Sequence, residues 1–188
     1  MVPVRKPDGS VRICVDYREL NAITPLRRHW LPSLQEILDK AGNSCVMSKL
    51  DLTSGFHQLE LEEESRELTS FSCPAGKFEF TRLPFGLKNA PAIFQATIEE
   101  VLRPVRGEAS TYIDDVLIYS KDWESHLQDV RKVVGCLGEA GLTVKKKKCE
   151  WGRKSMMYLG HKVGSDVMAV PECRVLSIKE YGKPKTKK

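Results

Sequence analysis

The sequence lacks the features of a membrane or secreted protein. No stretch of its 188 residues approaches the roughly 18 to 20 apolar residues that a membrane-spanning helix needs. The residues after Met1 are not the apolar block of a signal peptide. The six cysteines are scattered, without a C-x-x-C pair, and no histidine spacing suggests a zinc site. We therefore expect a soluble intracellular protein, cytoplasmic or nuclear, with reduced thiols and no membrane partner.

Repeats and low-complexity tracts are also absent, apart from the lysine run Lys145 to Lys148. A hydrophobic content of 41% can supply the core of one domain. The net charge of +5 is unevenly spread: residues 1–30 carry 6 basic and 3 acidic side chains, 31–144 carry 11 and 18, and 145–188 carry 13 and 4. Basic ends of this kind favour a polyanionic partner. The lysine run either follows a phosphate backbone or is a solvated face.

Periodicity predicts a mixed α+β domain. Alternation and turn residues predict hairpins over 1–17, 71–83 and 142–163, and strands over 45–52, 57–61 and 112–119. Capping residues and helical spacing predict helices from Leu34 to Ala41, from Asn89 to Leu102 and from Asp122 to Gly141. The core face of the last helix is predicted to carry Leu127, Val130, Val133, Val134 and Leu137. So many hairpins favour an antiparallel sheet with helices packed on one face over a doubly wound fold.

Two adjacent aspartates interrupt an otherwise apolar segment, Tyr112 to Tyr119. At a hairpin tip, Asp114 and Asp115 would hold like charges close together, and a cation would relieve their repulsion. Asp51 ends another apolar strand and could bring a third carboxylate to the same sheet edge. Three hard oxygen donors suit Mg²⁺, and a pair of ions can activate a hydroxyl and stabilise a leaving pyrophosphate. Because Asp-Asp is also ordinary turn composition, the dipeptide alone does not decide between these interpretations.

Five sequence blocks, in order, resemble those of reverse transcriptases. Tyr-Ile-Asp-Asp at 112–115 resembles the tyrosine-x-aspartate-aspartate box, and LDLTSGFHQ at 50–58 resembles the block with the first catalytic aspartate. LPFGLKNAPAIFQ at 83–95 is similar to the segment that forms the deoxynucleotide pocket. VDYRELN at 15–21 and YLGH at 158–161 also match. The resemblance is strongest to gypsy-type long-terminal-repeat retrotransposons and covers essentially the whole chain.

This resemblance implies a right-hand polymerase fold. The fingers would comprise about 1–25 and 58–99, the palm about 26–57 and 100–165, and the start of a truncated thumb 166–188. A full thumb, connection, ribonuclease H and integrase normally follow in the same polyprotein, and a protease precedes. Without a complete thumb, we expect weak binding of the primer and template and poor processivity.

The resemblance also implies site roles. Asp51, Asp114 and Asp115, with the Leu52 carbonyl, would hold two Mg²⁺ ions, or Mn²⁺ in their place. Lys6 and Arg12 would bind the triphosphate of the incoming dNTP, Phe56 would exclude a ribose 2′-hydroxyl, and Gln95 would contact the sugar near its 3′-hydroxyl. Primer contacts would come from Tyr112, Met157, Tyr158, Leu159 and Gly160. Without the resemblance, these residues would be interpreted as a solvated basic strand, a core aromatic, an exposed helical glutamine and a surface hairpin.

The implied function is RNA-directed and DNA-directed DNA polymerisation, in which dNTPs are added to a primer 3′-hydroxyl on an RNA or DNA template. An alternative is a retroelement relic that binds nucleic acid through its basic ends without using its catalytic capacity. A metal-dependent nuclease or cyclase with a similar palm would share the carboxylates. It would not account for the blocks at 83–95 and 159–160.

Overall fold

The computed structural model describes residues 2–5, 9 and 11–164. The strands are β1 (Val2–Arg5), β2 (Val11–Cys14), β3 (Val46–Asp51), β4 (Phe71–Cys73), β5 (Gly76–Phe78), β6 (Ala109–Tyr112), β7 (Asp115–Ser120), β8 (Glu150–Arg153), β9 (Ser155–Tyr158) and β10 (His161–Gly164). The α-helices are α1 (Arg18–Ile23), α2 (Leu34–Gly42), α3 (Glu63–Arg66), α4 (Ala90–Val101) and α5 (Trp123–Glu139). Short 3₁₀ turns are η1 (Gly55–Gln58), η2 (Glu67–Thr69), η3 (Arg103–Val105) and η4 (Lys146–Lys148).

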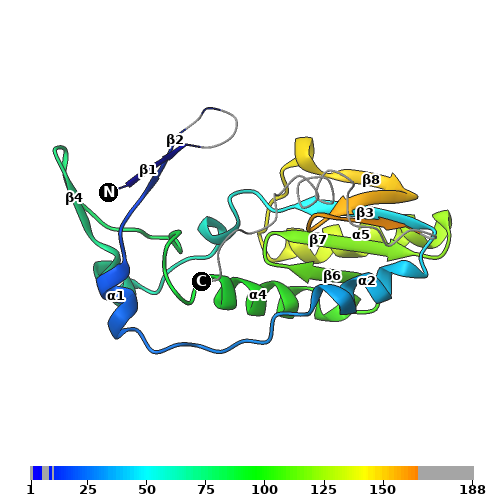
Figure 1. Ribbon diagram of the computed structural model, residues 1–188, viewed down its shortest axis with the longest axis horizontal. Helices are drawn as coiled ribbons and strands as arrows, with labels where there is room; N and C mark the ends of the chain where they lie inside the picture. Colours follow the sequence, from blue (N-terminus) through cyan, green and yellow to red (C-terminus); the bar gives the residue numbers. More distant parts are fainter. Residues whose placement is uncertain (1, 6–8, 10, 165–188) are drawn as a thin grey trace, which may run out of the picture.

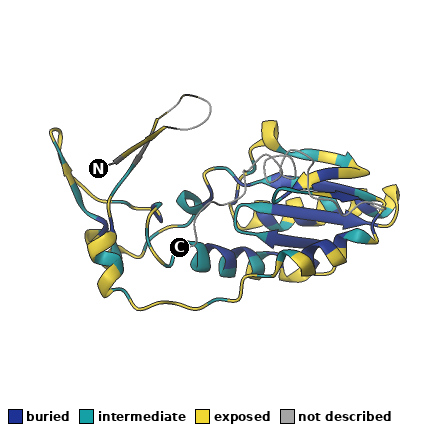
Figure 2. Cartoon of the chain, viewed as in Figure 1, coloured by how far each residue is buried: buried dark blue, intermediate teal, exposed yellow. Residues whose placement is uncertain are grey.

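The elements form two lobes (Figure 1). One lobe contains the hairpins β1–β2 and β4–β5 with α1, and the other contains the main sheet with α2, α4 and α5. Buried residues gather in the sheet lobe, whereas the two hairpins of the first lobe are largely exposed (Figure 2). In the described part of the chain, no helix is long and apolar enough to cross a membrane.

The main sheet is antiparallel, with the strand order β6-β7-β3-β8. Strand β3 pairs with β7 from Val46 opposite Ser120 to Asp51 opposite Asp115. Strands β6 and β7 are joined through Ile113 and Asp114, as the sequence predicts for the two aspartates. The antiparallel sheet expected from the many hairpins is therefore confirmed.

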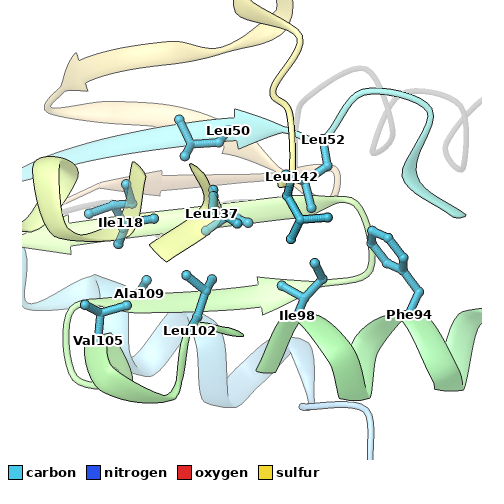
Figure 3. Packing of buried hydrophobic residues seen from close by; sticks show 12 residues of the cluster. Leu50, Leu52, Phe94, Ile98, Leu102, Val105, Ala109, Ile118, Leu137 and Leu142 are labelled. Atoms are coloured by element: carbon cyan, nitrogen blue, oxygen red, sulfur yellow. The ribbon is translucent and has the colours of Figure 1, made fainter. Parts of the chain in front are cut away.

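The two faces of this sheet carry different layers. One face packs against α4 and α5 through a core in which Leu50, Ile118 and Leu137 are buried (Figure 3). The opposite face, with Met47 and Leu117, packs against α2 and the β9–β10 hairpin. The expected sheet with helices on one face is confirmed for α4 and α5. Strand residues alternate between faces, so apolar residues such as Met47 and Leu117 also reach the other face, where α2 and the β9–β10 hairpin cover them.

The caps of α2 and α5 follow the sequence closely, whereas Asn89 stands at the N-cap of α4 without a side-chain hydrogen bond to that helix. Ser33 and Glu36 form the predicted capping box at the start of α2, with Glu36 N–H donating to Ser33 Oγ at 3.1 Å and Ser33 N–H to Glu36 Oε2 at 3.3 Å. Asp122 caps α5 by accepting the Ser125 N–H at 2.9 Å. Such caps depend on neighbours within one helical turn, which is why the sequence alone identifies them.

The predicted core face of α5 is partly wrong. Val133 and Leu137 are buried, but Leu127 and Val134 are 40% and 41% exposed. The helix instead turns the polar side chains of His126 and Asp129 toward the sheet. These two residues hydrogen-bond to buried serines there, and this hydrogen bonding compensates for their burial.

Two predicted extended segments also differ. Residues 57–61 lie partly in η1, and within them only Glu60 forms an isolated bridge, to Arg82. Residues 142–163 do not form one hairpin, because β8 joins the main sheet beside β3 while β9 pairs with β10. Strand patterns do not specify a partner, so the sequence could not distinguish these pairings.

Candidate active site

Asp51 and Asp115 lie directly opposite each other on adjacent strands. The Leu52 N–H donates to the Asp114 carbonyl at 3.0 Å, which makes Asp51 and Asp115 a pair without direct backbone hydrogen bonds. Residues at such positions point to the same face, with Cβ atoms about 4.5–5.5 Å apart. Two carboxylates are thus held side by side on the face that carries the β9–β10 hairpin.

Asp114 occupies the turn beside this pair, and its carboxylate lies against Gly55. A Cβ built on Gly55 would be 2.0 Å from Asp114 Oδ1, and the φ of Gly55 is +29°. Only glycine leaves room for the carboxylate at this approach. The nearby Leu52 carbonyl, a predicted ligand, accepts a long hydrogen bond of 3.5 Å from the Gly55 N–H.

Two lysines place positive charge next to the carboxylates. Lys148 Nζ is 3.0 Å from Asp51 Oδ2. Lys49 Nζ pairs with Glu150 at 3.0 Å and donates to the Met157 carbonyl at 3.3 Å. Burial raises the pKa of the Asp115 carboxyl and the Asp51 carboxylate raises it further, whereas Lys49 and Lys148 lower it.

The donor chemistry at this edge fits a divalent cation. In the residues that the structure describes, no three His, Cys, Asp or Glu side chains are already turned toward one metal position. Asp51 faces Lys148, and Asp114 faces Gly55. Three carboxylates and a main-chain carbonyl are nevertheless the hard oxygen ligands that Mg²⁺ takes, and the opposed Asp51 and Asp115 charges favour a shared cation.

The predicted primer-binding hairpin lies next to the aspartates. Tyr158 is fully buried and its hydroxyl donates to the Asp115 carbonyl at 3.2 Å, so this side chain supports the sheet and does not face solvent. Met157 is 42% exposed. Leu159 and Gly160 form the turn with φ values of +47° and +78°, and Leu159 and Tyr112 line one cavity.

Phe56 lies in η1, on the chain segment that follows Asp51. Its ring is partly buried and packs on Phe85 and Phe94, with centroid separations of 5.1 and 5.5 Å. The ring therefore belongs to the edge of the core. Its position beside the aspartates is compatible with the predicted exclusion of a 2′-hydroxyl.

Gln95 does not lie where a nucleotide could reach it. Its side chain is fully buried under the aspartate hairpin. Its amide oxygen accepts the Ile113 N–H at 2.7 Å, and its amide nitrogen donates to Thr111 and Glu99. The predicted contact between Gln95 and the deoxyribose is therefore corrected, because the amide already serves the protein's own backbone.

Two predicted triphosphate ligands cannot be placed. Lys6 lies outside the described residues, and of Arg12 the structure describes the backbone in β2 but not the side chain. The predicted thumb segment 166–188 also lies outside the described residues.

Lys49, Lys148 and Gly55 belong to the site but were not predicted as members of it from the sequence. Lys148 stood within a lysine run, and nothing in the run distinguishes it from its neighbours. The position of Lys49, two residues before Asp51 on a strand, was an available signal because such residues share a face.

Comparisons with known proteins agree on one family. The family model described as reverse transcriptase (RNA-dependent DNA polymerase) matches residues 4–163. The chain is 39% identical over 185 residues to the retrovirus-related Pol polyprotein from transposon 297 of Drosophila melanogaster, covering 96% of this chain and 18% of that protein. It is 40% identical over 174 residues to the Pol polyprotein from transposon gypsy of the same organism, covering 92% and 17%. The chain thus spans under a fifth of these relatives.

Solved structures give the same answer. A foamy viral protease-reverse transcriptase in complex with double-stranded DNA superposes with a TM-score of 0.88 at 30% identity, covering 97% of this chain and 32% of that one. The foamy viral protein in complex with an RNA/DNA hybrid gives a TM-score of 0.84 at 30% identity, covering 97% and 24%. By sequence, by fold and by the order of its motifs, this chain belongs to the reverse transcriptase family.

Proposed function

We propose that this protein is the polymerase domain of a gypsy-type retroelement and adds deoxynucleotides to a primer 3′-hydroxyl on an RNA or DNA template. The observation that carries the proposal is the opposition of Asp51 and Asp115 on one sheet face, with Asp114 in the adjoining turn. The family membership and the nucleic-acid complexes of the related foamy viral proteins support it. In this proposal, the fingers comprise about 1–25 and 58–99 and the palm about 26–57 and 100–165.

The aspartates would hold the divalent ions. Asp51, Asp114 and Asp115, with the Leu52 carbonyl, are the ligands that we assign. Two bound Mg²⁺ ions would supply Lewis acidity to activate the primer hydroxyl and stabilise the leaving pyrophosphate. The burial that raises the pKa of Asp115 leaves this carboxylate poorly solvated, so it gains more from a cation than an exposed carboxylate would.

Other residues would orient the two substrates. Met157, Leu159, Gly160 and Tyr112 would contact the primer end, because the β9–β10 turn and Tyr112 lie together beside the aspartates. The buried Tyr158 would not contact the primer but would hold the Asp115 backbone in place through the hydrogen bond from its hydroxyl to the Asp115 carbonyl. We assign the triphosphate to Lys6 and Arg12, and the exclusion of a ribose 2′-hydroxyl to Phe56.

Primer extension with aspartate variants tests this proposal. Asp114→Asn and Asp115→Asn keep the shape of each side chain but remove its charge. We expect each to reduce extension of a labelled primer by at least ~10³-fold, since both would lose a ligand of the reacting centre. Circular dichroism and thermal unfolding should show that both variants remain folded.

Glu139→Gln is the matched control, because it removes one acidic charge at the end of α5. It should retain wild-type extension. Full activity in either aspartate variant would refute the site assignment. A wild-type chain that binds primer and template but does not extend the primer would favour the relic hypothesis.

A further inference from the structure

The hairpin turn that presents Asp114 is unusual in its backbone. Ile113, the first residue of its two-residue loop, has a φ of +53°. A β-branched side chain disfavours this conformation, which glycine usually adopts at such positions. In this turn, the Ile113 N–H also lies outside the strand ladder, because the last ladder pair is Tyr112 with Asp115. The turn therefore needs support from outside the hairpin.

Gln95 of α4 provides that support. Its Oε1 accepts the Ile113 N–H at 2.7 Å, and its Nε2 donates to the Thr111 carbonyl at 3.1 Å and to Thr111 Oγ1 at 3.0 Å. One buried side chain thus contacts both the last part of β6 and the loop that follows it. It bridges the helix layer and the residue next to Asp114.

Glu99 determines which way the Gln95 amide points. Glu99 Oε1 accepts from Gln95 Nε2 at 2.7 Å, so the amide nitrogen faces this carboxylate and the oxygen faces Ile113. Glu99 Oε2 lies 3.1 Å from His29 Nε2. A flipped amide would place its oxygen against the Glu99 carboxylate and its nitrogen against the Ile113 N–H, and both contacts would be repulsive.

We propose that Gln95 is a positioning residue that holds the strained Ile113–Asp114 turn, with Glu99 orienting its amide, and thereby orients Asp114 for catalysis. This inference rests on the proposed function for its catalytic consequence. The contact of Gln95 with Ile113, which is the structural part of the inference, does not depend on the proposed function. It differs from a nucleotide-contacting role, because a positioning residue affects turnover and not the binding of the dNTP.

Gln95→Met tests the inference, since methionine fills a similar volume without donating or accepting a strong hydrogen bond. We expect kcat for primer extension to fall by roughly 10-fold or more, as for loss of a buried hydrogen bond, with KM for the dNTP changed less than about twofold. Hydrogen exchange of the Ile113 amide, measured by NMR, should accelerate by roughly 10-fold or more. Glu99→Gln should change both quantities in the same direction by a smaller factor.

Thr97→Val is the matched control on the same helix. Among the described residues, Thr97 Oγ1 bonds the Ile93 carbonyl within α4 at 3.0 Å and no other group, so its loss should leave kcat and Ile113 exchange unchanged. Unchanged Ile113 exchange in folded Gln95→Met would overturn the inference. So would a raised KM with unchanged kcat, which would indicate direct dNTP contact. Because exchange needs no activity, an inactive wild-type chain with accelerated exchange in Gln95→Met would reject the proposed function and retain the contact.

Discussion

Among single residues, Lys148 partly neutralises the negative charge of the aspartate site. Lys148 Nζ lies 3.0 Å from Asp51 Oδ2, on the carboxylate that we assign to a divalent ion. The Asp51 side chain is 22% exposed and that of Lys148 is 57% exposed, so water weakens their attraction. A lysine in this position relieves the repulsion between Asp51 and Asp115, and it would have to move away from Asp51 for the proposed metal ion to bind there.

We predict that Lys148→Met raises the affinity of the chain for Mn²⁺. The Lys148 ammonium competes with Mn²⁺ for Asp51 through an ion pair that is partly exposed. Its removal should therefore tighten Mn²⁺ binding by only about two- to fivefold, measured by electron paramagnetic resonance of free Mn²⁺. Lys147→Met removes the same charge from the neighbouring exposed residue and should have a smaller effect. Equal affinities in wild type and Lys148→Met would show that Lys148 does not compete for Asp51.

At the scale of elements, α5 is joined to the sheet by a buried polar network. His126 lies 2.7 Å from Ser48 Oγ through Nε2 and 3.0 Å from Ser120 Oγ through Nδ1. Ser120 Oγ donates to Asp129 Oδ2 at 2.8 Å, and Ser48 Oγ accepts the Gly152 N–H at 3.0 Å. Residues from α5, β3, β7 and β8 thus share one network.

This network predicts a loss of stability in mild acid. Burial lowers the pKa of His126 from 6.5, and Asp129 opposes this effect only in part. Because the unfolded chain then binds the proton more readily, stability is full above about pH 6.5 and falls as the pH drops toward the folded pKa, by at most about 1.4 kcal/mol per pH unit. Urea unfolding from pH 7.5 to 5.5 measures the slope.

His126→Gln should reduce this pH dependence, although it also lowers stability at pH 7.5 because the network is broken. The control His161→Gln removes a histidine outside the network and should retain the wild-type slope. If His126→Gln and wild type lose stability in parallel as the pH falls, His126 is not the group responsible.

Across the whole molecule, lysines lie at both ends of the main sheet, but only one of these groups lies near the aspartates. The lysines of η4 lie near the aspartate end of the sheet, where the Lys145 N–H donates to the Asp51 carbonyl at 2.8 Å. Lys40 and Lys121 lie at the opposite end, beyond Val46 and Ser120. If primer and template cross the aspartate end, only the first group can neutralise phosphates.

We predict that Lys146→Gln with Lys147→Gln lowers the salt dependence of primer–template binding. The slope of log K against log[salt] should decrease in magnitude by up to about 2. The double variant loses two phosphate contacts, so its binding releases fewer counterions. Fluorescence anisotropy from 50 to 200 mM KCl measures this slope. Lys40→Gln with Lys121→Gln carries the same change in charge and should keep the wild-type slope. Equal slopes in both double variants would assign the lysine run to a solvated face.

Local patterns were enough for several features of this protein. The caps of α2 and α5 and the hairpin that carries Asp114 depend on residues close together in sequence, so each was predicted correctly. The resemblance of the motifs predicted the family. The prediction that Gln95 contacts the deoxyribose was wrong, because no local pattern shows that a polar helical residue will be buried under a hairpin 18 positions away.

Sequence alone was sufficient for the caps of α2 and α5 and for the turn between β6 and β7, since these follow from short-range hydrogen bonding and side-chain alternation. The order of the reverse transcriptase motifs is read directly along the chain. Long-range packing set the opposition of Asp51 and Asp115, the ion pair of Lys148 with Asp51 and the burial of His126 in place of Leu127 on α5. Strand register and helix rotation minimise the free energy of the whole packed core, to which residues far apart in the chain contribute together.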